Sequence, residues 1–175
     1  MSVFGNEQRY GAIAQAIHWL TAILVLATWL VAGTWRGGHP EMKVLHETLG
    51  LGVFALVILR ILWHGLDRHP AELPGNPLLA LTARLTHWAL YALLVLIPLT
   101  AIVGSWVEGH ALTIYGIGTI GPFLTTSRSL GHLILEVHQL VGTTIIWVAG
   151  LHAAAAIFHH LILRDRTLRR MLPAG

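Results

Sequence analysis

Apolar residues along this chain gather into four long blocks, separated by shorter polar segments. The blocks cover about residues 13–35, 47–65, 84–107 and 132–163, and the few charged residues within them lie near block ends. An α-helix needs about 20 apolar residues to cross the hydrocarbon core of a bilayer, and each block is near or above that length. The pattern predicts an all-α integral membrane protein, a four-helix bundle in which residues 1–175 form one domain.

The composition agrees with this prediction. Of the residues, 55% are hydrophobic and 11% are charged, whereas a soluble domain has about 25% charged residues. The first block has the position of a signal peptide, but Glu7 and Arg9 precede it in place of a basic cluster and its apolar run is too long. We therefore expect it to remain as the first membrane span.

The basic residues predict the orientation of the four spans. An even number of spans puts both termini on one side of the membrane, together with the loop at 66–83. Eight arginines fall on that side (Arg9, Arg60, Arg68, Arg84, Arg164, Arg166, Arg169 and Arg170), against Arg36, Lys43 and Arg128 on the other. The positive-inside rule then places both termini in the cytoplasm. No basic face is interleaved with base-reading residues, so nucleic-acid binding is not expected.

The absence of cysteine and one glycine motif limit the cofactors that the chain could bind. The chain has no cysteine, which excludes iron–sulfur clusters, disulfides and covalently attached c-type haem. The loop at 108–131 contains YGIGTIG, which satisfies G-x-G-x-x-G. A dinucleotide site needs a following helix, whereas Pro122 follows the last glycine. This motif is expected to be a turn-forming loop.

The chain has 12 histidines, and their positions sort them. His39, His69 and His110 fall in loops and are expected to be exposed, and His64 and His132 fall at span ends, where interfacial positions are expected. The remaining seven lie within the apolar blocks or, for His46, directly before one: His18, His46, His87, His138, His152, His159 and His160. A polar ring in lipid is costly and needs a partner. These seven are the candidates for a functional site.

Depth in the membrane arranges the candidates in pairs. His138 and His152 are about 40° apart on one helix face and about 21 Å apart along its axis. The first span enters from the cytoplasm, so His18 is level with His152, and the second enters from outside, so His46 is level with His138. Bis-histidine ligation of two b-type haems fits this layout, because helix bundles build cofactor sites from facing helices.

His87 also matches the depth of His152, so it competes with His18. A flat porphyrin needs a small residue one helical turn from its ligand, and His87 is followed at that position by Tyr91. The corresponding residues of the four paired histidines are all small: Ala22, Gly50, Gly142 and Ala156. This favours His18 without excluding His87, since small residues also serve helix packing.

Two other interpretations of these histidines remain. They are hydrogen bonds across helices and ligation of a metal ion. A zinc or copper transporter would more naturally show midplane carboxylates or sulfur ligands. The spans contain neither near the midplane.

Four segments carry a resemblance to a known family. QAIHWL, VLHETLGL, THWALYALLVLIPL and EVHQL…GLHAAAAIFHH resemble the bacterial cytochrome b561 family over about residues 9–173. The chain is most similar to the short free-standing members, which include superoxide oxidase. The resemblance implies a multi-pass protein of the bacterial inner membrane with two haem b groups. His18 and His152 would ligate the inner haem and His46 and His138 the outer one.

The resemblance also implies a function. Ubiquinone would bind as a substrate near the cytoplasmic haem, where His87 and His159 match the family pattern. The favoured activity is that of a superoxide:ubiquinone oxidoreductase, with superoxide attracted by Arg36, Lys43 or Arg128. The alternatives are a quinol-linked cytochrome serving a periplasmic redox protein and a histidine-lined metal transporter. The haem potentials, which decide the direction of electron flow, depend on hydrogen bonds that the sequence does not show.

Overall fold

The computed structural model describes residues 2–39, 41–68, 70–71 and 76–172, so His69 lies outside the described residues. The described chain forms four long helices, α1 (Ala12–Arg36), α2 (Met42–Leu66), α3 (Pro77–Glu108) and α4 (Arg128–Phe158). All four are long and apolar enough to cross a membrane. The predicted mostly helical fold with four spans is confirmed.

α3 extends beyond its apolar block because caps, rather than hydropathy, determine where it begins and ends. α3 begins at Pro77 instead of near residue 84, since the Asn76 side chain accepts the backbone N–H of Leu78 and Pro77 occupies the first turn. It ends at Gly109, which has the left-handed φ of 96° that glycine tolerates. α4 continues into a π-helical turn at His159–Leu163.

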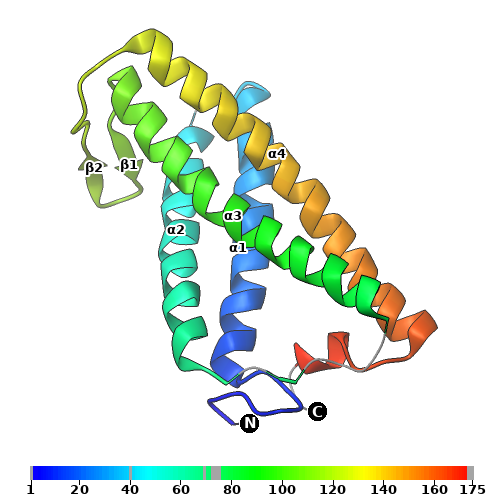
Figure 1. Cartoon of the computed structure of the whole chain (residues 1–175). Coiled ribbons are helices and arrows are strands. Elements are labelled where there is room, and N and C mark those ends of the chain that lie inside the picture. The colour runs from blue at the N-terminus through cyan, green and yellow to red at the C-terminus, as the bar shows by residue number, and fades with distance from the viewer. Residues whose placement is uncertain (1, 40, 69, 72–75, 173–175) are drawn as a thin grey trace.

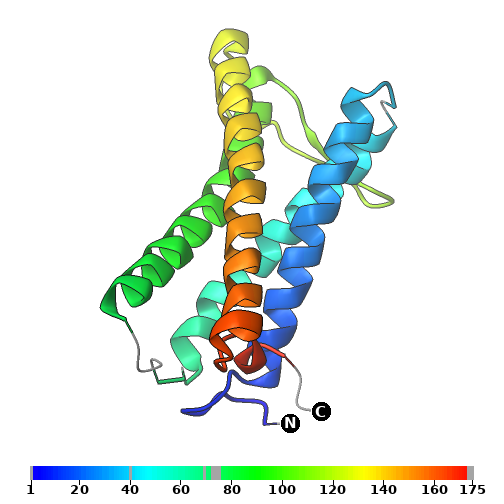
Figure 2. The ribbon, with the colours of Figure 1, turned by 90° about the vertical axis from the view of Figure 1, so that its right-hand side faces the viewer.

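The four helices associate as two pairs. α1 packs mainly along α2, and α3 packs mainly along α4. Figures 1 and 2 show the two pairs from two sides, with both termini at one end of the molecule. A small buried cluster joins the pairs (Val53, Val57, Leu94 and Ile145). Large apolar side chains such as Trp88 and Trp147 are more than 70% exposed, as expected where lipid is the solvent.

A short β-hairpin connects α3 and α4 at the end opposite the termini (Figure 1). β1 (Leu112–Ile114) pairs antiparallel with β2 (Gly118–Ile120). Gly116 and Gly118 have positive φ in the turn, so the glycine motif is a turn, as predicted, although the strands were not. The backbone N–H of Thr113 donates to Glu47, which ties the hairpin to the start of α2.

Candidate functional site

Two histidine pairs connect the two halves of the bundle. His46 of α2 faces His138 of α4, with 6.2 Å between the ring centres. His18 of α1 faces His152 of α4, with 6.4 Å between the ring centres. The structure therefore brings together the four residues predicted as haem ligands, in the predicted pairs. α4 contributes one member to each pair.

The ring separations fit a metal held between each pair. Two imidazoles bound to opposite sides of one metal, each through a bond of about 2 Å, have ring centres about 6 Å apart. His87 also lies beside His152, but their ring centres are 5.3 Å apart, which is short for such an arrangement. Both His18 and His87 thus lie beside His152, and the His18 ring is at the separation closer to 6 Å.

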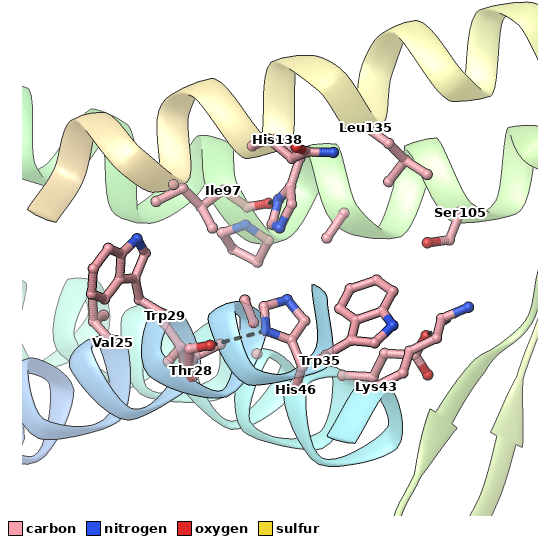
Figure 3. A pocket seen from close by; sticks show the side chains of 18 of the residues that line it. Val25, Thr28, Trp29, Trp35, Lys43, His46, Ile97, Ser105, Leu135 and His138 are labelled. Carbon is pink, nitrogen blue, oxygen red and sulfur yellow. Dashed lines mark hydrogen bonds and ion pairs between the residues drawn. The ribbon is translucent and has the colours of Figure 1, made fainter. Parts of the chain in front are cut away.

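Backbone carbonyls orient both rings of the His46/His138 pair. Nδ1 of His46 lies 3.0 Å from the carbonyl of Thr28, and Nδ1 of His138 lies 2.9 Å from the carbonyl of Ile97. A carbonyl only accepts hydrogen bonds, so each Nδ1 carries the proton and each Nε2 keeps its lone pair. Figure 3 shows the two side chains extending towards each other from opposite sides of the pocket. This is the tautomer that a metal ligand requires.

The same pair borders a largely apolar cavity of about 510 Å³. Trp29 and Trp35 line it, and so do Gly50 and Gly142. At both glycines an added Cβ would meet no atom within 4 Å. The open space beside each histidine fits a flat apolar group such as haem b, whose ring would lie where larger side chains would project.

The His18/His152 pair has a charged neighbour instead of carbonyls. Nη2 of Arg60 lies 3.2 Å from Nδ1 of His18, and Nε of Arg60 donates to the hydroxyl of Tyr91 at 3.2 Å. The guanidinium also lies over the Tyr91 ring, 5.2 Å from its centre. From the sequence, Arg60 was used only to predict the orientation of the spans. Its presence inside an apolar block was the signal that it lies at a functional site.

His159 lies at the end of the molecule that carries the termini. Its Nδ1 donates to Oδ2 of Asp165 at 2.5 Å, and Oδ1 of Asp165 accepts the backbone N–H of Thr167 at 2.8 Å. Burial by itself raises the pKa of Asp165, but the hydrogen bonds from His159 and Thr167 outweigh it, so the pKa lies below its ordinary value. Asp165 was missed from the sequence, where it is an isolated acid in a basic tail.

The end of the molecule opposite the termini carries the basic residues that were expected to attract superoxide. Arg36 and Lys43 line the cavity beside His46, whereas Arg128 begins α4 and is absent from the lining. Lys43 lies 3.7 Å from Glu47. Glu108 lies 3.2 Å from His110 and 3.7 Å from His132. Both histidines are exposed, which was predicted for His110, whereas His132 was expected at the membrane interface.

The fold and the histidine pairs define a class of protein, the membrane cytochromes b. A sequence model of the prokaryotic cytochrome b561 family matches residues 9–174. The chain belongs to this family, which confirms the resemblance seen in its sequence. It is therefore an oxidoreductase that transfers electrons in the membrane with haem b, and a multi-pass protein of the bacterial inner membrane.

Individual relatives match over almost their whole length. "Cytochrome b561 homolog 2" of Escherichia coli K12 is 30% identical, and the match covers 98% of this chain and 95% of the relative. "Probable superoxide oxidase CybB" of Yersinia pestis is also 30% identical, over 95% of this chain and 97% of the relative. "Cytochrome b561 homolog 1" of Escherichia coli K12 is 29% identical. The similarity to these relatives thus extends over almost the full chain.

Proposed function

We propose that this chain is a di-haem cytochrome b that passes electrons from superoxide on the periplasmic side to ubiquinone near the cytoplasmic side. The observation that carries the proposal is the presence of two histidine pairs, 6.2 and 6.4 Å across, at two depths of one bundle. Two superoxide anions lose one electron each and leave as dioxygen. Ubiquinone takes both electrons and two protons and becomes ubiquinol.

The four paired histidines are the proposed ligands. His46 and His138 hold the outer haem and His18 and His152 the inner one. Haem b, when bound, supplies storage for one electron at each site. The 6.4 Å separation favours His18 over His87 as the partner of His152, and His87, which is exposed, is then available to ubiquinone.

The proposed orientation puts both termini in the cytoplasm, because the arginine-rich segments lie at the end of the molecule that carries them. The β-hairpin then faces the periplasm. A green fluorescent protein fused after residue 172 should fluoresce, while alkaline phosphatase fused there should be inactive. The reverse pattern would overturn the orientation and exchange the two ends of the electron path.

At the cytoplasmic end, His159 is the proposed proton donor to the quinone. Asp165 holds Nδ1 of His159, which leaves Nε2 to face a quinone carbonyl. An imidazole ring nitrogen can accept and donate a proton, and so it can pass one to the quinone. The paired carboxylate stabilises the ring after it has accepted a proton from the cytoplasm. His87 is proposed to bind the second carbonyl.

At the periplasmic end, the proposed attraction for superoxide comes from Arg36 and Lys43 beside the outer pair. A positive rim raises the local concentration of a small anion. Glu47 offsets part of this charge through its contact with Lys43. The relative from Yersinia pestis that is named a probable superoxide oxidase gives further support for superoxide as the donor.

The direct test mixes the oxidised, purified protein with a pulse of superoxide in a stopped-flow instrument, with and without ubiquinone. Fast reduction of two haems per chain, followed by reoxidation when ubiquinone is present, is the expected result. The Arg36→Gln variant should slow the first phase and leave reoxidation unchanged. Haem bands that do not respond to superoxide but respond to ubiquinol would overturn superoxide as the donor.

One observation favours a second function, electron exchange with a periplasmic redox protein. The hairpin region exposes three large side chains at the proposed periplasmic end, Tyr115, Ile117 and Phe123, each more than 70% accessible. Exposed apolar groups of this kind are typical of protein docking sites. The metal-transporter interpretation is replaced by electron transfer, which the family membership assigns.

A further inference from the structure

The two histidine pairs differ in the groups that contact their Nδ1 atoms. In the His46/His138 pair, both Nδ1 atoms bind backbone carbonyls. In the His18/His152 pair, Nδ1 of His18 faces the guanidinium of Arg60. The nearest polar groups therefore have opposite electrostatic character at the two sites.

Arg60 is held at its position inside the membrane-spanning part of α2. It is half-buried, hydrogen-bonded to Tyr91 and stacked over the Tyr91 ring. Among the residues that the structure describes, no carboxylate forms an ion pair with it. A guanidinium is charged at every physiological pH. The inner site therefore has a fixed positive charge that the described protein does not neutralise.

These neighbours have opposite effects on a redox centre. A carbonyl that accepts a hydrogen bond from Nδ1–H makes the imidazole a stronger electron donor, which stabilises the oxidised metal. A fixed cation stabilises the reduced state, because reduction removes one positive charge from its vicinity. The effect of a charge is larger where water is excluded, as in the bilayer interior.

We propose that Arg60 raises the reduction potential of the inner haem site above that of the outer site, and so directs electrons towards the cytoplasmic end. This inference rests on the proposed function for the identity of His18 and His152 as ligands. It adds the direction of electron flow and the residue that sets it. Arg60 acts through charge and is a positioning residue, since it contacts His18 and no substrate.

The cations of the outer site do not cancel this difference. Arg36 is exposed at the end of α1, where water and salt screen its charge. Lys43 lies 3.7 Å from Glu47, which compensates its charge. Arg60 is half-buried and its described partners are not carboxylates, so its charge is reduced less than those of Arg36 and Lys43.

Ligation changes one contact of Arg60 and leaves the other. A neutral histidine that binds a metal through Nε2 carries its proton on Nδ1, so it cannot accept a hydrogen bond from Arg60 at the same time. The bond from Arg60 to His18 therefore belongs to the ligand-free form. The bond from Nε to Tyr91 is independent of ligation and keeps the charge beside the pair.

The test measures each site separately in full-length protein. The His46→Ala variant should retain only the inner haem and the His18→Ala variant only the outer one. Spectroelectrochemical titration of the two should give the higher potential for the inner haem. Adding Arg60→Gln should lower the inner potential by about 59 mV, a tenfold change in a one-electron equilibrium, and should leave the outer potential unchanged.

Three further variants sharpen the result. Arg60→Lys keeps the charge and should restore most of the inner potential. Arg36→Gln removes a cation at the other end and should leave the inner potential unchanged. If Arg60→Gln does not fold, Tyr91→Phe, which removes the hydroxyl that holds Arg60, should lower the same potential by a smaller amount.

The outcomes separate this inference from the proposed function. Equal potentials at the two sites, or an inner potential that Arg60→Gln leaves unchanged in a protein with both haems, would overturn the role of Arg60 alone. A His46→Ala protein without haem, or a wild-type protein with one haem per chain, would overturn the ligand assignment and this inference with it.

Discussion

Single hydrogen bonds fix the tautomer of three histidines in this protein. The carbonyls of Thr28 and Ile97 fix the protons of His46 and His138 on Nδ1, which exposes Nε2 for ligation. The carboxylate of Asp165 does the same for His159, where Nε2 is available to a substrate. In the proposed function, His46 and His138 are ligands and His159 is a proton donor, and each role uses the Nε2 that these hydrogen bonds leave free.

The ligand role of His138 can be tested by its removal. His138→Ala should bind one haem per chain in place of the two proposed for the wild type, because one imidazole holds the iron far more weakly than two. The measurement is the haem content per chain from the pyridine haemochrome spectrum. His110→Ala, at an exposed histidine beside Glu108, is the matched control and should retain both. Two haems in His138→Ala would contradict the assignment.

The hydrogen bonds of Asp165 predict a pH dependence of stability. Its pKa is lowered in the folded protein, so the carboxylate stabilises the fold above the ordinary carboxylate pKa and loses this contribution as the pH falls through the lowered value. Asp165→Asn should destabilise the protein by about 1 kcal/mol at pH 7. The difference from wild type should vanish at acidic pH, as followed by thermal unfolding in detergent. A difference that stays constant with pH would contradict this.

At the scale of the helices, glycines provide the space beside the ligands. Gly50 and Gly142 each lie one turn after a histidine of the outer pair and border the cavity. An added Cβ would meet no atom at either position, so packing between helices does not explain why they are small. The proposed outer haem would explain the two small residues, because its ring would occupy this space.

Filling that space should displace the outer haem. Gly142→Leu projects a side chain into the cavity, so it should reduce the haem content from two to one per chain while the protein still folds. Gly150 lies on the same helix, is exposed and has the same open surroundings. Gly150→Leu is therefore the control and should retain both haems. Equal haem content in the two variants would show that the cavity is not the haem site.

At the scale of the whole molecule, the two helix pairs have few direct contacts with each other. Each histidine pair takes one residue from the α1–α2 pair and one from α4. Bound haem would therefore connect the two halves across the space between them. The cofactor is expected to contribute to the stability of the fold as well as to its chemistry.

Removal of haem should accordingly lower the thermal stability. A ligand present at 100 times its dissociation constant stabilises the folded state by about 2.7 kcal/mol, which corresponds to about 5 °C or more for a chain of this size. Differential scanning of haem-depleted protein, before and after addition of haemin, measures the shift. The His18→Ala/His46→Ala double variant is the control and should not respond. An unchanged midpoint in the wild type would contradict a cofactor that joins the helix pairs.

Much of the fold could be predicted because lipid imposes a simple rule. A membrane span must be apolar, long and helical, so the four blocks located α1 to α4, and helical rise placed the histidines at matching depths. The ends of the helices were predicted less well. The early start of α3 depends on the Asn76 cap, and the β-hairpin depends on contacts with Glu47 and Thr48 of α2.

By itself, the sequence determined the four spans, the family and the histidine pairs, because hydropathy and helical periodicity act locally along the chain. The tertiary structure alone decided which neighbour each histidine has. The contacts of His18 with Arg60 and of His138 with Ile97 join residues that are more than forty positions apart in the sequence. Their hydrogen bonds depend on how separate helices pack, and no local pattern encodes them.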